Sequence, residues 1–153
     1  MKRRQAREAV LCMLFDYGFH TEEKPEELLE LYLDYFYDKK EENISEEIRL
    51  DDYFSKVYFG VIANIAEIDG IIEKCSQKWS KKRISRISLS AIRIAIYEML
   101  YMSGEKDGIS PEISINEAVE LVKKYDSEDS YTFVNGVLGA AYRLIKEQKS
   151  AAE

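Results

Sequence analysis

Apolar residues recur every three or four positions along almost the whole chain, and this spacing is the strongest constraint on its fold. The pattern is clearest between residues 50 and 79 and returns in every later segment. Such spacing places the apolar side chains on one face of an α-helix, where they can pack against other helices. The 153 residues include only seven Gly and two Pro, too few for the many turns of an all-β domain. The sequence therefore predicts an all-α protein.

About seven helices are expected, joined by short loops and packed as two small helical bundles. We expect one domain over residues 1–153, with approximate subdomains 1–80 and 81–153. Pro25 is expected to open the second helix, and residues 39–45 to form an exposed loop. Gly70 is expected to mark a helix boundary or a kink near Ile68, and Ser114 with Glu117 fits a capping box. Gly136 and Gly139 are expected to allow close packing of the last helix against another helix, the alternative being the close approach of a ligand backbone.

Charge is distributed unevenly along the chain, whose formal net charge is −7. Residues 1–20 carry four basic and two acidic side chains, and residues 76–95 carry six basic and no acidic ones. The remaining segments are acidic. An acidic body would repel a polyanion, whereas two basic islands can hold a short stretch of one. Charge alone leaves open the alternative that the islands only solvate helix ends.

Several classes of function lack the residues they need. The chain has a single histidine, His20, which is expected at the surface, and no glycine-rich phosphate loop. Cys12 and Cys75 form no metal or redox spacing and are expected to be reduced core residues. No apolar run approaches the ~20 residues of a membrane-spanning helix, and the charged start does not resemble a signal peptide. These features disfavour an enzyme or a cofactor protein, and predict a cytoplasmic one without membrane contact.

The first helix begins with a cluster of basic residues. Arg3 and Arg7 are one helical turn apart and therefore project from the same side. A cationic first turn opposes the helix dipole at a cost of a few tenths of a kcal/mol per charge, which suggests a separate use for the arginines. Guanidinium groups bind phosphates through paired hydrogen bonds.

Four stretches of the sequence match signatures of a known family in order and spacing. They are RRQAREA at residues 3–9, AIRIAIYEML at 91–100, INEAVEL at 115–121 and FVNGVL at 133–138. Along nearly its whole length the chain resembles the NusB family of transcription antitermination factors. The resemblance implies a bacterial, non-catalytic protein that needs no cofactor and consists of two small helical bundles.

The resemblance also implies the partners of the protein. These are boxA-type single-stranded RNA, the small-subunit ribosomal protein NusE, other Nus factors and RNA polymerase, acting especially on ribosomal RNA operons. By position, it implies a set of RNA-binding residues: Lys2, Arg3, Arg4, Arg7, Phe15, Asp129, Ser130 and Phe133. For Phe133, stacking on a base and packing in the core remain equally open.

Some positions depart from the family pattern. Cys12 and Phe15 replace a common Gln and Tyr, so Phe15 keeps an aromatic plane but lacks a hydroxyl donor. Ser88 stands where an acid is usual, in a region implied to meet the protein partner, and Gly139 replaces an Asp. The effects of these changes and a possible homodimer stay open. One alternative is a helical protein–protein adaptor without RNA binding. Another is an appendage of a ribosomal RNA methyltransferase, which the absent cofactor domain disfavours.

Overall fold

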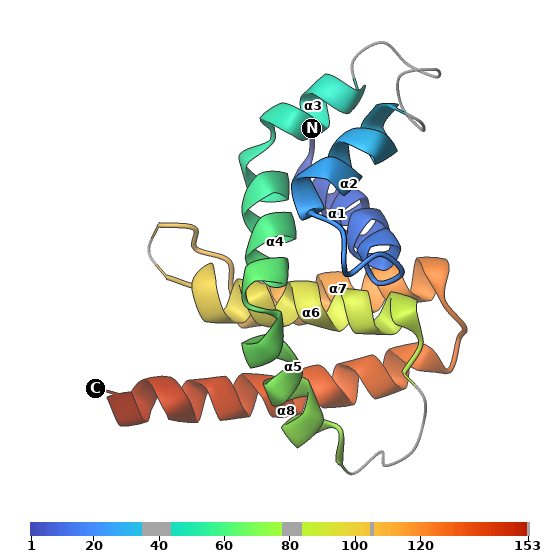
Figure 1. Cartoon of the computed structure of the whole chain (residues 1–153). Helices are drawn as coiled ribbons and strands as arrows, with labels where there is room; N and C mark the ends of the chain where they lie inside the picture. The colour runs from blue at the N-terminus through green and yellow to red at the C-terminus, as the bar shows by residue number, and fades with distance from the viewer. Residues whose placement is uncertain (35–43, 78–83, 105, 153) are drawn as a thin grey trace. The chain divides into compact units, whose positions relative to one another are not determined.

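Helices make up most of the computed structural model, which describes residues 1–34, 44–77, 84–104 and 106–152. Within these ranges there are eight α-helices and no strand (Figure 1). Their bounds are α1 Arg3–Tyr17, α2 Pro25–Tyr32, α3 Ile44–Leu50, α4 Asp52–Ala63, α5 Ile65–Cys75, α6 Arg86–Tyr101, α7 Pro111–Tyr125 and α8 Ser130–Ala152. The predicted all-α class is confirmed, with eight helices in place of about seven.

The chain divides into two compact units, Met1–Ala63 and Asn64–Glu153. In the first unit α1 packs on α2 and α4, and α3 packs on α4. In the second, α6, α7 and α8 pack against one another, and α5 packs on α6 and α8. These contacts of α5 place the division between Ala63 and Asn64, earlier than the boundary expected at residue 80.

The first unit is held by a buried stripe on α1 and by side-chain contacts between its short helices. Pro25 occupies the first turn of α2, as predicted. Arg49 of α3 donates to both carboxylate oxygens of Glu30 on α2, at 3.3 and 3.0 Å. The loop expected over residues 39–45 lies mostly outside the described residues, but Ser45 is a buried residue of α3 that donates to the Leu33 carbonyl at 3.4 Å.

The break in the long apolar segment falls at Asn64, which precedes α5. Gly70 lies inside α5, and nothing comes within 4 Å of where its Cβ would be. The boundary between helices thus lies at Asn64, a few residues before the position expected near Ile68, and Gly70 is part of α5. A glycine inside a helix costs only about 1 kcal/mol relative to Ala, which the buried Ile68, Ile71 and Ile72 of the same helix can offset.

The start of α7 also differs from the prediction. Pro111 begins the helix, and the Ser110 hydroxyl caps it by accepting from the Ile113 amide at 3.3 Å. Proline favours the first helical position, so the helix begins one turn earlier than predicted. Ser114 is consequently not a cap: it is 2% exposed and donates to Oε1 of the buried Glu98 on α6, at 2.7 Å.

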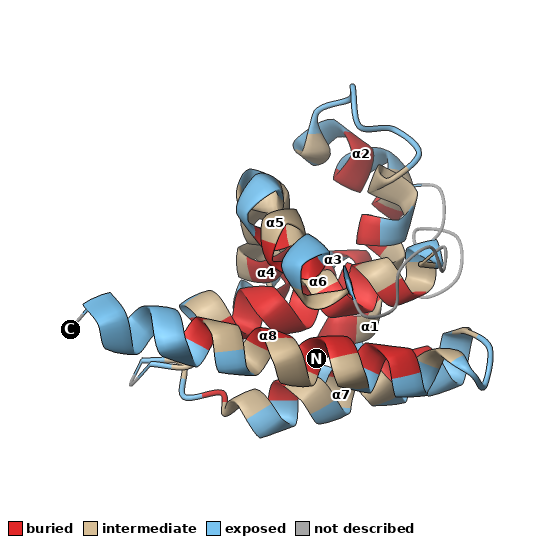
Figure 2. Cartoon of the chain, turned by 90° about the horizontal axis from the view of Figure 1, so that it is seen from below, coloured by how far each residue is buried: buried red, intermediate tan, exposed pale blue. Residues whose placement is uncertain are grey.

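The long helix α8 contributes a buried face to the second unit, while its C-terminal end is exposed (Figure 2). Near that end, Lys149 Nζ donates to the Met99 carbonyl at 2.9 Å and to Ser103 Oγ at 3.0 Å, which holds α8 to the end of α6. A Cβ at Gly139 would meet only the Arg143 guanidinium, at 3.7 Å. The close helix packing expected at Gly139 is thus not seen.

The remaining expectations concern isolated side chains. Cys12 and Cys75 are free thiols, as predicted, but they are only half-buried. Burial raises the pKa of both thiols. His20 is exposed. Over the described residues, none of the helices is long and apolar enough to cross a membrane, and no group of His, Cys, Asp or Glu is arranged to hold a metal ion.

Candidate nucleic-acid interface

The N-terminus of α1 presents a basic surface. Lys2, Arg3 and Arg4 are exposed, and the first turn of α1 contains no acidic residue. The Gln5 side chain accepts a hydrogen bond from the Lys2 amide at 2.9 Å, which fixes the start of the helix. Three cationic side chains are therefore presented to solvent around one rigid helical turn.

Tyr53, at the start of α4, organises two of the predicted arginines. The Cζ atom of Arg3 lies 4.5 Å from the Tyr53 ring centroid, and that of Arg7 lies 5.4 Å from it. Both distances are within the range of cation–π attraction. The ring is only 6% exposed and is therefore a fixed support. Sequence reasoning missed Tyr53, because only the packing of α1 on α4 brings it to the arginines.

Arg7 differs from the other members of the cluster. Its side chain is buried, with 4% of the residue exposed, so little of its guanidinium is open to a ligand. Arg3 is exposed and shares the same aromatic support. This arrangement favours Arg3 for direct phosphate contact, whereas Arg7 contributes charge and packing from beneath.

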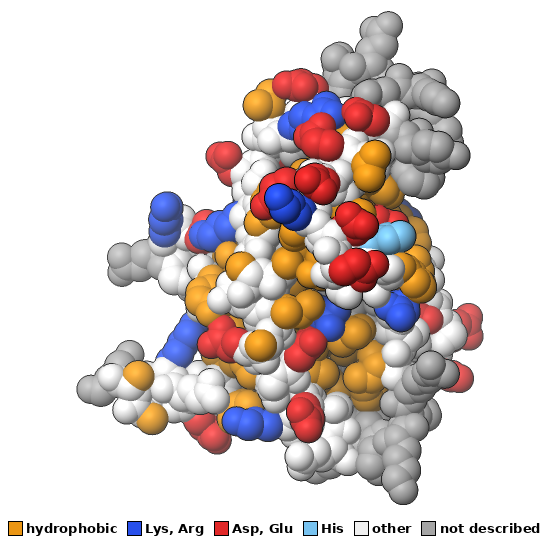
Figure 3. Space-filling view, in the orientation of Figure 1, with side chains coloured by type: hydrophobic (Ala, Val, Ile, Leu, Met, Phe, Trp, Pro, Cys, Tyr) orange, Lys and Arg blue, Asp and Glu red, His pale blue; other side chains and the backbone are white. Residues whose placement is uncertain are grey.

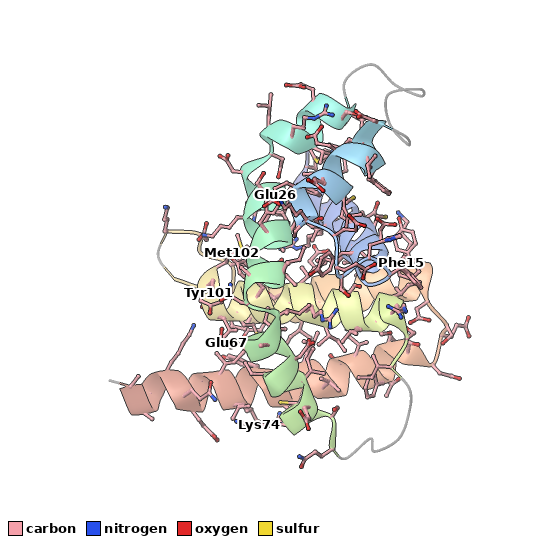
Figure 4. All side chains as sticks on the ribbon, viewed as in Figure 1. Phe15, Glu26, Glu67, Lys74, Tyr101 and Met102 are labelled. Carbon is pink, nitrogen blue, oxygen red and sulfur yellow. The ribbon has the colours of Figure 1, made fainter. Side chains whose placement is uncertain are left out.

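Phe15 lies on α1 and is 37% exposed (Figure 4). It meets the more exposed Phe19 edge to face, with ring centroids 5.3 Å apart. An exposed aromatic plane is what a single-stranded base needs for stacking. The structure thus extends the predicted Phe15 to an aromatic pair. Phe19 was missed because it lies just beyond the end of α1, outside the helical pattern.

The predicted residues of the second unit meet at one pocket. Its volume is about 300 Å³, and its lining consists of Ile84, Ser85, Ser88, Asp126, Ser127, Asp129, Ser130 and Phe133. The start of α6 and the turn between α7 and α8 provide these residues. Four of them, Ser88, Asp129, Ser130 and Phe133, were singled out from the sequence, so the structure brings those four together.

Asp126 is the hydrogen-bonding centre of this pocket, and sequence reasoning did not single it out. Its Oδ2 accepts from the Ser88 hydroxyl at 2.7 Å and also from the Ser85 hydroxyl. Its Oδ1 accepts from the Ser127 amide at 2.8 Å. Partial burial acts to raise the pKa of Asp126, but the hydrogen bonds from Ser85, Ser88, Ser127 and Ser130 outweigh it and lower the pKa.

The lowered pKa of Asp126 predicts a pH-dependent contribution to stability. A depressed carboxyl pKa stabilises the fold above the pKa of the unfolded state, and the effect is lost as pH falls through the pKa of the folded state. Asp126→Asn is therefore expected to lower the unfolding midpoint at pH 7, with the difference from the parent shrinking toward pH 3. Urea titrations at both pH values measure this. A difference that grows toward low pH would contradict it.

Ser88 and Phe133 are both largely buried. Ser88 is 2% exposed, which leaves little of it for the protein contact expected there. Phe133 is 9% exposed and follows the same buried face of α8 as Val137. Most of the Phe133 ring therefore packs in the core, which was one of the two alternatives left open by the sequence. Its remaining surface forms one wall of the pocket.

Acidic side chains follow α1 in the sequence. They gather on α2 and α3, as the upper part of Figure 3 shows.

In the second unit, Tyr101 donates to Glu67 across α6 and α5 (Figure 4). This hydrogen bond, together with burial and the Glu67 charge, raises the pKa of Tyr101 to about 12. This hydrogen bond joins α5 and α6.

The four sequence motifs at residues 3–9, 91–100, 115–121 and 133–138 lie on α1, α6, α7 and α8 of this helical fold. The model of the NusB family matches residues 4–143, and the chain belongs to that family. A Listeria monocytogenes protein named transcription antitermination protein NusB is 41% identical over 138 residues, covering 90% of this chain and 94% of the relative. A Thermoanaerobacter protein of the same name is 40% identical over 143 residues, covering 94% and 91%.

Solved structures show the same relationship. NusB from T. maritima superposes with a TM-score of 0.71 at 34% identity, over 94% of this chain and 92% of that one. A chain in the crystal structure of antitermination factors NusB and NusE in complex with dsRNA superposes with a TM-score of 0.69 at 29% identity, over 93% and 96%. The family resemblance seen in the four motifs is confirmed.

Proposed function

We propose that this protein is a bacterial antitermination factor that binds boxA-type single-stranded RNA together with NusE. In this role it supports transcription of ribosomal RNA operons in the cytoplasm, alongside other Nus factors and RNA polymerase. The protein performs no catalysis in this proposal. Its contribution is a surface that holds RNA and partner protein together.

The observation that carries the proposal is the exposed basic turn of α1. Lys2, Arg3 and Arg4 offer phosphate-binding donors, and Tyr53 holds the Arg3 guanidinium from below. The exposed Phe15 and Phe19 rings, on the same unit, offer stacking surfaces that favour unpaired bases over a closed duplex. The relative solved with NusE and dsRNA supports NusE and RNA in general as partners, whereas the preference for single-stranded RNA rests on the exposed rings.

Fluorescence anisotropy tests the proposal. A labelled boxA RNA and a scrambled RNA of equal composition are titrated with the protein, with and without NusE, at two salt concentrations. We expect boxA to bind more tightly than the scrambled RNA, NusE to strengthen that binding, and affinity to fall as salt rises. Equal, salt-insensitive affinities would instead favour the helical adaptor.

A homodimer would compete with this role if its interface covered the basic turn. Sedimentation of the protein alone and with RNA tests it. We expect the RNA-bound protein to sediment as one copy of the chain per RNA. A dimer that retains full RNA affinity would show that the two surfaces are separate.

Tyr53 provides a prediction about how the arginines are held. Tyr53→Leu removes the aromatic face and is expected to weaken RNA binding about three- to tenfold, because a cation–π contact contributes about 0.5–2 kcal/mol. Tyr53→Phe keeps the aromatic face, so its RNA affinity is expected to stay within about twofold of that of the parent. Anisotropy measures both variants. In an Arg3→Gln, Arg7→Gln background the leucine change is expected to have no further effect. An equal loss in that background would show that Tyr53 acts independently of the arginines.

A further inference from the structure

A second pocket lies within the second unit, between the C-terminal end of α5 and the middle of α8. Its volume of about 590 Å³ is in the usual range of ligand pockets. Lys74 lines it from the last turn of α5 (Figure 4), and Arg143 and Glu147 line it from α8. All three charged side chains are exposed, so a ligand can reach them from solvent.

Arg143 has no carboxylate partner within the described part of the chain. Glu147 follows it by one helical turn, the spacing at which helical ion pairs form, yet the two side chains form no ion pair. The guanidinium extends toward the preceding turn instead, where its Nη1 lies 3.7 Å from the position that a Cβ at Gly139 would occupy. A guanidinium binds a carboxylate through paired hydrogen bonds, and this one is open to bind one.

The positive charges of Arg143 and Lys74 converge on the pocket lining. Burial raises the pKa of the half-buried Cys75 thiol, and the charges of Arg143 and Lys74 both act against that rise. Two helices therefore direct cations at one part of the pocket, which favours an anion there. Glu147 on the same lining opposes a second negative charge. The balance of two cations and one carboxylate fits a ligand with a single negative charge.

The rest of the lining is apolar or small. Gly136, Ala140 and Leu144 of α8 line the pocket and are partly exposed, and the neighbouring Cys75 acts as a small apolar side chain. Burying apolar surface is favourable in proportion to its area. A ligand that carries an apolar body beside its negative group therefore uses this lining, whereas a bare anion leaves it exposed to water.

We propose that the pocket between α5 and α8 binds a small organic monocarboxylate with an apolar body. The carboxylate accepts hydrogen bonds from Arg143, with Lys74 beside it, and the apolar body covers Ala140 and Leu144. This site is distinct from the basic first turn of α1, and it adds a small-molecule ligand to the partners proposed above.

Three small probes separate the carboxylate from the apolar body. The intact protein is titrated with 3-phenylpropionate while the backbone amide signals of Gly136 and Gly139 are followed by NMR. We expect a saturable shift with a Kd on the order of 1 mM, as the size of this probe allows. Acetate lacks the apolar body and 3-phenylpropanamide lacks the charge, so each is expected to bind about tenfold more weakly or worse. Equal affinity for acetate and 3-phenylpropionate, or no saturable shift, would overturn the inference.

Gly139 allows a test with two variants of matched size. Gly139→Asp places a carboxylate one helical turn before Arg143, where it occupies the guanidinium without lining the pocket. It is expected to weaken 3-phenylpropionate binding about tenfold or more, as is Arg143→Gln, because a hydrogen bond to a charged group is lost. Gly139→Asn has the same size without the charge and is expected to stay within about threefold of the parent. An affinity for the probe that is equal in Gly139→Asp, Gly139→Asn and the parent would contradict the role of Arg143.

Two controls define the background and the source of the carboxylate. Lys146→Gln removes a cation of α8 that does not line the pocket, and its affinity for the probe is expected to stay within about twofold of the parent. Circular dichroism checks that every variant is folded. Binding of boxA RNA and of NusE is expected to be equal in Gly139→Asp and Gly139→Asn. Loss of NusE binding in the aspartate variant alone would assign the carboxylate to a protein partner, and loss of RNA binding would assign the pocket to the RNA surface. Either result would overturn the proposal of a small-molecule site.

Discussion

Replacing Arg3 and Arg4 by glutamine is expected to weaken boxA binding by a factor on the order of a hundred or more at 0.1 M salt. The reason is the loss of two exposed phosphate-binding groups, since hydrogen bonds to charged groups contribute about 1.5–3 kcal/mol each and about 1.4 kcal/mol corresponds to tenfold. The slope of log affinity against log salt is expected to fall by about 1.4, which is two single-strand phosphate contacts. Anisotropy titrations across a salt series measure both quantities.

A matched control separates this effect from net charge. Lys106→Gln with Lys146→Gln removes the same charge from two exposed positions of the second unit, and is expected to leave the salt slope unchanged. Glutamine is preferred to charge reversal, because a carboxylate beside Tyr53 and the buried Arg7 would disturb packing as well as binding. If the control pair lost as much affinity as the Arg3, Arg4 pair, general attraction to the whole protein would explain the binding.

Truncating Glu98 is expected to have the largest effect on stability. Glu98 is 1% exposed on α6 and accepts from the Ser114 hydroxyl of α7 at 2.7 Å. Glu98→Ala leaves a cavity and an unpaired buried hydroxyl, and changes of this kind cost about 2–5 kcal/mol. Ser114→Ala removes only the donor and is expected to cost about 1–3 kcal/mol. Urea unfolding of each variant measures these losses.

A control on α7, the helix of Ser114, defines the background for this prediction. Glu120 is exposed and lies 3.9 Å from Lys123 in a surface ion pair, so Glu120→Ala is expected to change stability by less than about 0.5 kcal/mol. Ser114→Ala with stability equal to that of the parent would show that the buried hydrogen bond contributes nothing. Reduced RNA affinity in a fully folded Ser114→Ala protein would mean that the start of α7 contributes to RNA binding.

Local patterns were enough to predict the helical class and the basic start of α1. The spacing of apolar residues depends only on which residues are apolar, so it can be recognised without knowledge of the tertiary structure. It failed where two local rules competed. Both Ser110 and Ser114 are good helix caps, and Pro111 decides between them because it occupies the first turn. Gly70 has the conformational freedom to break a helix, yet the buried isoleucines of α5 keep it helical.

Two residues of the candidate site, Tyr53 and Asp126, were not predicted for another reason. Tyr53 lies beside Arg3 and Arg7 only because α4 packs on α1. In the sequence it follows both arginines by forty-six positions or more. Asp126 joins Ser85 and Ser88 only because the turn after α7 meets the start of α6. Pairings of this kind depend on how helices pack within each unit, and no periodicity in a single segment reports them.

The central claim is that RNA is held at the basic first turn of α1, and crosslinking tests it most directly. A boxA RNA containing 4-thiouridine is bound to the protein together with NusE, irradiated, digested and analysed by mass spectrometry. We predict crosslinked peptides from residues 1–19, reduced strongly by the Arg3→Gln, Arg4→Gln pair and not by the Lys106, Lys146 control. Crosslinks that are confined to other parts of the chain and persist in the arginine variant would contradict the claim.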